Sequence, residues 1–155
     1  MLEISQILAR LLIALVVGAL MGLERETAGK EAGIRTEMLV SAGSALYTMI
    51  ALMLPYLFFI DYFPQANLEE IIARNSGFMG IIANIVVGIG FLGAGIIIKN
   101  RNHVYGLTTA ALVWATSAIG IMTGLGLWQE AIVSAFMISG LLFLLRRLDI
   151  SPGSA

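Results

Sequence analysis

The charged residues that could do chemistry are concentrated in residues 24–36, which read E-R-E-T-A-G-K-E-A-G-I-R-T. Carboxylates such as those of Glu24 and Glu26 are ligands that Mg²⁺ accepts, one or two at a time with water retained. We therefore consider this pair a weak magnesium site. The functional candidates of the stretch are Glu24, Arg25, Arg35 and Thr36. A solvated loop that fixes topology, or a purely structural Glu24–Arg35 ion pair, would explain the same residues, and the sequence leaves these alternatives open.

Asn84 is the next candidate, because it is the only amide near the middle of an apolar segment. A carboxamide in hydrocarbon needs hydrogen-bond partners, so we expect Asn84 to bond a neighbouring helix. A contact to a substrate is the alternative interpretation. The sequence alone does not separate structural bonding from binding.

The residue types of common enzyme sites are absent from the sequence. The chain has no Cys and one His, which excludes thiolate catalysis, Cys-ligated metals and a His cluster. We find no pairing of a nucleophile with a base, and no phosphate loop. A net charge of −1 without a basic patch gives no sign of nucleic-acid binding. We expect no enzymatic activity and no cofactor other than Mg²⁺ as a ligand.

A glycine-rich run at residues 86–99, V-V-G-I-G-F-L-G-A-G-I-I-I-K, contains the letters of a dinucleotide-binding motif. That motif needs a preceding strand, a following helix and an acidic residue about twenty positions later, and none is visible here. The run instead lies in an apolar segment long enough to cross a bilayer. Small residues there let a neighbouring helix approach closely. The helix-packing candidates are Gly18, Gly22, Gly88, Gly90, Gly93 and Gly95.

The elements that must position these residues are membrane-spanning helices. The chain is 59% hydrophobic and 12% charged, and its mean hydropathy is +0.93. Such a composition is typical of an integral membrane protein. Apolar segments cover about residues 4–23, 37–60, 78–98, 106–124 and 128–145. The predicted fold is an all-α transmembrane bundle of about five spans over residues 1–148, followed by a short polar tail at 149–155.

The distribution of basic residues predicts the orientation of this bundle. Seven of the nine Lys and Arg residues follow the first, third and fifth segments, and only Arg10 and Arg74 fall on the other side. By the positive-inside rule, the N-terminus is outside and the C-terminus is cytoplasmic. We expect Arg10 to extend to the outer interface and to pair loosely with Glu3. A short helix beginning at Asn67 and ending before Gly77 is expected in the outer connection.

Small residues predict which spans are central. The fourth segment carries small residues on two faces and is expected at the centre of the bundle. The fifth carries larger apolar residues and is expected at the periphery, exposed to lipid. Several glycine-rich faces favour a homo-oligomer.

Four sequence blocks resemble the MgtC/SapB family in order and spacing. They are G-L-E-R-E (22–26), G-I-R-T (33–36), G-I-G-F-L-G-A-G (88–95) and G-L-T-T-A-A (106–111), and W-A-T-S-A-I-G (114–120) extends the match. The resemblance implies a multi-pass bacterial inner-membrane protein with a role in growth under magnesium limitation and in virulence. It also implies restraint of the ATP synthase in the best-studied members.

The sequence departs from the family in three places. Glu37 follows Arg35-Thr36 where members often have His, and Gly77 to Gly80 replace a frequent Asp-x-x-Arg pair. The sequence ends before the ACT-like C-terminal domain of virulence-type members. The leading hypothesis is a non-enzymatic regulator of a membrane complex such as the ATP synthase. The alternative is a small oligomeric transporter or channel for magnesium or another solute, which the absence of a carboxylate in any span interior weakens.

Overall fold

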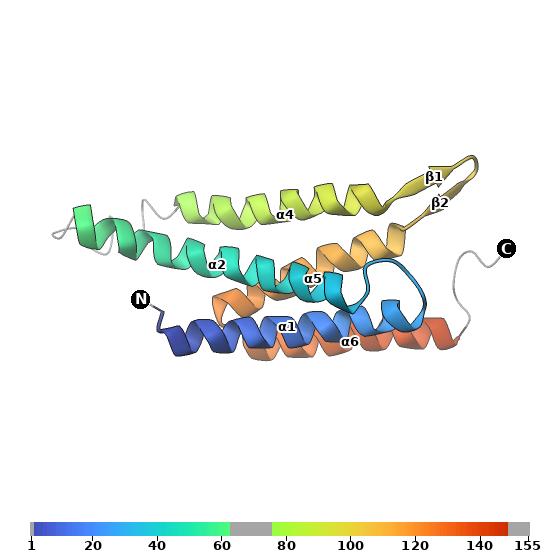
Figure 1. The fold of residues 1–155 in the computed structure, drawn as a ribbon, viewed down its shortest axis with the longest axis horizontal. Coiled ribbons are helices and arrows are strands. Elements are labelled where there is room, and N and C mark those ends of the chain that lie inside the picture. Colours follow the sequence, from blue (N-terminus) through green and yellow to red (C-terminus); the bar gives the residue numbers. More distant parts are fainter. Residues whose placement is uncertain (1, 63–75, 149–155) are drawn as a thin grey trace.

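The computed structural model describes residues 2–62 and 76–148, which form a bundle of long helices (Figure 1). The helices are α1 (Ile4–Thr27), α2 (Ile34–Tyr62), α4 (Ser76–Ile96), α5 (Leu107–Leu125) and α6 (Trp128–Arg147). Between α4 and α5, β1 (Ile98–Asn100) pairs antiparallel with β2 (His103–Tyr105). The five apolar segments predicted from the sequence are therefore confirmed as helices. The predicted outer helix between Asn67 and Gly77 lies largely outside the described residues.

Four of these helices are long and apolar enough to cross a membrane. They are Ile4–Thr27, the Ile34–Leu54 part of α2, Leu107–Leu125 and Trp128–Arg147. Helix α4 contains a shorter apolar stretch, Gly80–Ile96. At about 1.5 Å per residue, a helix of 19 to 24 residues matches a hydrocarbon core of about 30 Å. The molecule is a polytopic membrane protein.

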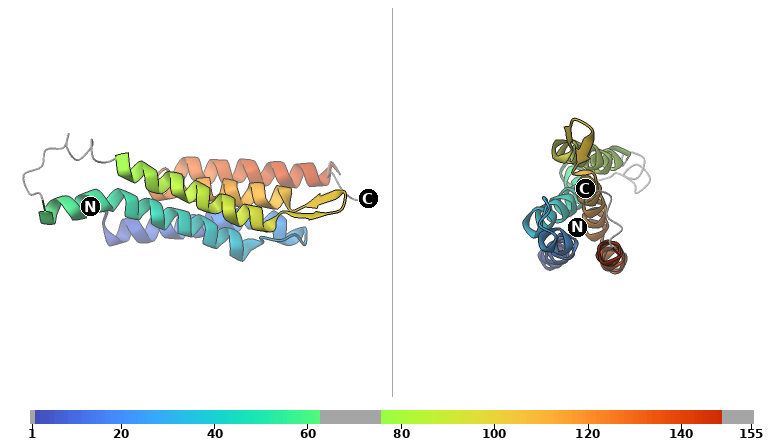
Figure 2. Two further views of the ribbon diagram at one scale, coloured as in Figure 1. Left: turned by 90° about the horizontal axis from the view of Figure 1, so that it is seen from above. Right: turned by 90° about the vertical axis from the view of Figure 1, so that its right-hand side faces the viewer.

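Helix α5 lies at the centre of the bundle. It contacts α1, α2, α4 and α6, and about 61% of its most apolar stretch is buried inside the protein, compared with 11% for α6 (Figures 1 and 2). The expectation of a central fourth span and a peripheral fifth span is confirmed. Small and hydroxyl residues make this possible, since they let several helices approach one axis at once.

The tightest helix contacts pass over glycines. A Cβ added at Gly124 would lie 2.7 Å from the Ala45 carbonyl oxygen, and one at Gly120 would collide with the Ser41 carbonyl oxygen. A Cβ added at Gly18 would lie 2.6 Å from the Glu37 carbonyl oxygen. Such distances leave no room for any side chain. Helix α2 is thus held against α5 on one side and α1 on the other.

Helix α4 lies at the edge of the bundle, on the side opposite α6 (Figures 1 and 2). It packs against α5 and α2. Of its four predicted packing glycines, Gly93 contacts α5, where an added Cβ would lie 3.6 Å from the Ala110 side chain. Added Cβ atoms at Gly88, Gly90 and Gly95 would meet no atom of the described residues within 4 Å. These three glycines face outward from the single chain.

Arg10 does not pair with Glu3 as expected. Its Nη1 atom donates to the Gly124 carbonyl oxygen at 2.6 Å, near the C-terminus of α5. The last carbonyls of a helix lack intrahelical partners and carry partial negative charge, so a cation binds them well. Glu3 instead caps α1, where its backbone N–H donates to Gln6 Oε1 at 3.2 Å. The polar stripe at the start of the chain therefore stabilises helix ends.

The α1–α2 connection, the β1–β2 hairpin and the end of α6 lie together at one end of the bundle (Figure 1). Seven basic residues lie in these elements or in the adjoining turns of α1 and α2: Arg25, Lys30, Arg35, Lys99, Arg101, Arg146 and Arg147. The fold therefore gathers on one end the charges used to predict the cytoplasmic side.

Candidate functional site

A groove of about 720 Å³ lies between α2 and α4. Its walls are largely apolar, with a few polar side chains. The lining residues are Arg35, Thr36, Leu39, Val40, Gly43, Ser44, Tyr47, Ile81, Asn84, Ile85, Gly88, Ile89 and Leu92. Three of the sequence-predicted functional candidates, Arg35, Thr36 and Asn84, are thus brought into one groove with Gly88.

Arg35 and Thr36 reach the groove from the first turn of α2, where both side chains are exposed. Within residues 2–62 and 76–148, Arg35 forms no ion pair. The alternative of a structural Glu24–Arg35 ion pair is not found, because Glu24 pairs with its neighbour Arg25 in the described structure. The guanidinium therefore places a positive charge at one end of an otherwise apolar surface.

Asn84 lies on the α4 wall of the groove and is exposed. The expected hydrogen bond from its carboxamide to a neighbouring helix is not present in the described part of the chain. Asn84 and Gly88 are one helical turn apart, so they share the α4 face that α2 leaves partly uncovered. The amide is therefore exposed to the groove.

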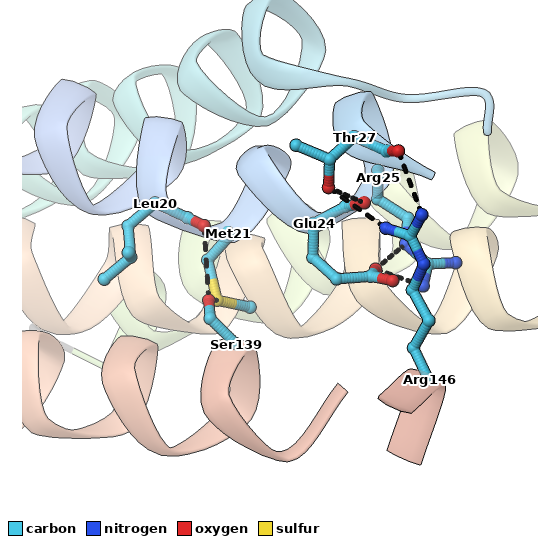
Figure 3. Close-up of polar contacts among 7 residues, drawn as sticks. All are labelled: Leu20, Met21, Glu24, Arg25, Thr27, Ser139 and Arg146. Atoms are coloured by element: carbon cyan, nitrogen blue, oxygen red, sulfur yellow. Dashed lines mark hydrogen bonds and ion pairs between the residues drawn. The ribbon is translucent and has the colours of Figure 1, made fainter. Parts of the chain in front are cut away.

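Glu24 and Arg25 belong to a second cluster, which joins α1 to α6 (Figure 3). The Arg25 Nε atom donates to Glu24 Oε2 at 2.5 Å, and both residues are less than 10% exposed. Nearby, Arg146 of α6 donates to the Thr27 hydroxyl at 3.2 Å and to the Thr27 carbonyl oxygen at 3.1 Å. The Arg146 contacts hold the C-terminal end of α1 against α6, whereas the Glu24–Arg25 pair joins two neighbouring residues of α1.

Glu26, the second carboxylate of the magnesium site considered from the sequence, does not lie beside Glu24. It is exposed, and its Oε2 atom accepts a hydrogen bond from the Ile34 backbone N–H at 3.1 Å. Residues two apart on a helix lie on different faces. The structure therefore does not bring Glu24 and Glu26 together. The described residues also contain no group of three or more His, Cys, Asp or Glu that could hold a metal ion.

Glu37 is the residue that sequence reasoning missed. It lies in the first turn of α2, as its place in the sequence suggested, but its side chain is fully buried. The signal was a polar stripe at helical spacing on α2, formed by Glu37, Ser41, Ser44 and Thr48, all of which are buried. A polar stripe on an apolar helix faces protein, and α5 supplies the opposing hydroxyls: Ser44 Oγ lies 2.9 Å from Ser117 Oγ.

Residues 11–150 match the family described as "MgtC family". The chain belongs to the MgtC family. The match begins at residue 11, within α1, and extends beyond the end of α6.

Three curated relatives illustrate the similarity. Protein SrpB of Synechococcus elongatus is 38% identical over 135 residues, which cover 82% of this chain and 68% of SrpB. Protein MgtC of Brucella abortus is 36% identical over 135 residues, 87% of this chain and 49% of that protein. YhiD of Escherichia coli K12, whose name describes a candidate magnesium transporter, is 33% identical over 133 residues, 86% of this chain and 57% of YhiD. No solved structure matched.

The chain therefore spans about half to two thirds of the length of these relatives. The blocks that resemble the MgtC family lie near one another in space: residues 22–26 end α1, 33–36 begin α2, 88–95 form the last turns of α4 and 106–111 begin α5. In Figure 1 all four occupy the half of the bundle that carries the β1–β2 hairpin. The open groove between α2 and α4 extends from this half.

Proposed function

We propose that this MgtC-family protein is a non-enzymatic regulator in the bacterial inner membrane. It acts by contacting another membrane complex, such as the ATP synthase, and serves adaptation to low magnesium and virulence. The observation that carries the proposal is the uncovered face of α4. Along it, Asn84 and Gly88 are exposed beside an apolar groove that has a guanidinium at one end.

Such a face suits a transmembrane partner. Lipid chains are as apolar as leucine, so helix association in a bilayer depends on close packing and on hydrogen bonds between helices. Gly88 and Gly95 share the helix face of Asn84 and carry no side chain, so a partner helix can approach closely there, and Asn84 offers donors and an acceptor. A partner helix could lie against α4 while an acidic group near its end meets Arg35.

Transport of magnesium is less well supported by the same groove. Its charged lining residue is an arginine, which repels a dication, and none of its lining residues is acidic. Helix α4 is also continuous from Ser76 to Ile96, without the unwound backbone that ion sites often use. The regulator is therefore the function we favour.

The test is ATP-driven proton pumping in inverted bacterial membrane vesicles at fixed magnesium, with and without the protein. We expect wild type to inhibit pumping, and Arg35→Gln and Gly88→Leu to abolish the inhibition. Arg101→Gln is the matched control, because it removes an equally exposed cation from the hairpin at the same end of the bundle. Its inhibition should equal that of wild type.

Unchanged pumping with wild type present at confirmed membrane levels would exclude the ATP synthase as the partner. Inhibition that survives both groove variants would remove the α2–α4 groove from the contact. Flux of Mg²⁺ into proteoliposomes holding only this protein would favour transport instead.

A further inference from the structure

Four buried polar atoms lie without hydrogen-bond partners in the described structure. They are both carboxylate oxygens of Glu37 and the hydroxyl oxygens of Ser41 and Thr116. Each of the three residues is fully buried. Buried polar atoms are nearly always paired, so several orphans together require a physical explanation.

The helix contacts place these atoms in one cluster. Glu37 and Ser41 are one turn apart on α2, and Thr116 lies one turn before Gly120 on α5. Gly120 packs directly onto the Ser41 backbone, so the Thr116–Gly120 face of α5 opposes the Glu37–Ser41 face of α2. The Thr116 hydroxyl lies beside the Glu37 carboxyl group, close to it but outside hydrogen-bond geometry.

The surrounding charges do not balance an ionised Glu37. On α1, Arg25 acts on Glu37 at Coulombic range, but its guanidinium already bonds the Glu24 carboxylate. Helix α5 has no titratable residue between Leu107 and Leu125. On α2 itself, Arg35 is exposed and lines the groove. One negative charge is left over inside the bundle.

A buried charge without a partner is costly, and a single added positive charge removes that cost. A divalent ion does not fit, since Ca²⁺ and Mg²⁺ take six or more oxygen ligands and Mg²⁺ keeps several waters. The cluster also contains only one carboxylate, so a divalent ion would leave a second positive charge uncompensated inside the bundle.

We propose that Glu37, Ser41 and Thr116 form a binding site for one monovalent cation, supplied as a proton or as Na⁺. A proton and Na⁺ have in common that each would supply a single positive charge to the site without a hydration shell. A proton would reside on the carboxyl group, which then donates to a hydroxyl oxygen. A sodium ion would take the carboxylate and both hydroxyl oxygens as ligands. The site is separate from the α2–α4 groove and does not depend on the regulator proposal.

The experiment is thermal unfolding of the purified full chain in detergent. Two series are run: Na⁺ is exchanged for choline at constant ionic strength and fixed pH, and pH is varied without Na⁺. A ligand that binds only the native state raises the unfolding temperature as its concentration rises. We expect wild type to gain stability with Na⁺ or with falling pH, and Glu37→Gln to lose that response.

Glu31→Gln is the matched control, because Glu31 is exposed in the α1–α2 connection. It should respond as wild type does. Ser41→Ala and Thr116→Val should retain the response with an apparent affinity about tenfold weaker, the loss expected for one hydrogen bond or ligand to a charged group.

A response to Na⁺ at fixed pH assigns the sodium ion. A response to pH alone, with the infrared carbonyl band of a protonated carboxyl group that disappears in Glu37→Gln, assigns the proton. A wild type indifferent to both, or stabilised through Glu37 by Mg²⁺ only, overturns the proposal. If Glu37→Gln does not fold, the affinities of Ser41→Ala and Thr116→Val decide the same question.

Discussion

Glycines lie both in the α2–α5 contact and on the outer face of α4, but only those in the α2–α5 contact are covered by another helix of the chain. In the α2–α5 contact, Gly120 and Gly124 lie against the backbone of α2, and hydroxyl groups bond across the contact. On α4, Gly88 and Gly90 meet nothing in the described chain, and Asn84 has no partner there. Glycine spacing therefore identifies surfaces made for close helix contact, but the fold decides which of them the chain itself fills.

The largest expected effect is the difference in stability between a substitution at a glycine covered by another helix and one at an exposed glycine. Gly120→Leu must collide with the Ser41 backbone, which cannot move without displacing α2, so we expect a loss of more than about 3 kcal/mol and little folded protein. Gly90→Leu should fold as wild type does, because its added atoms meet open space. Thermal unfolding in detergent, together with the yield of monodisperse protein, measures both. Equal losses would contradict the distinction.

The second effect is the difference in stability between disturbing the buried Arg25 and removing the exposed Arg35, which lie at the same end of the bundle. Glu24→Gln leaves the buried Arg25 guanidinium without its carboxylate, and we expect a loss of about 3 kcal/mol. Arg35→Gln removes an exposed charge that lines the groove and should change stability by less than about 0.5 kcal/mol. Denaturant titrations of the two variants check this. A stable Glu24→Gln would show that the buried guanidinium does not depend on this carboxylate.

The smallest expected effect is the difference in stability between removing a paired hydroxyl, that of Ser117, and removing an exposed amide, that of Asn84. Ser117→Ala removes the partner of Ser44 in the α2–α5 contact, for an expected loss of about 1 kcal/mol. Asn84→Ala should leave the stability of the isolated chain unchanged, since Asn84 is exposed in the groove. If Asn84→Ala instead destabilises the purified protein, Asn84 already contacts another copy of the chain. Measurement at several protein concentrations would reveal such an assembly.

Much of the fold follows from the sequence alone. Apolar runs of about twenty residues predicted all five helices, and small residues predicted that the fourth is central, because hydropathy and residue size act locally along a helix. Arg35, Thr36 and Asn84 were also selected as candidates by type and position, and all three line one groove.

The pairing of charges and the filling of glycine faces were decided by the tertiary structure. Arg10 bonds the end of α5 instead of Glu3, and Glu24 pairs with Arg25 instead of Arg35. Glu37 lies at the start of a span and is nevertheless fully buried between α1 and α5. Helix periodicity specifies which face a side chain occupies, whereas only the packing of distant helices decides what meets that face and whether its charge is compensated.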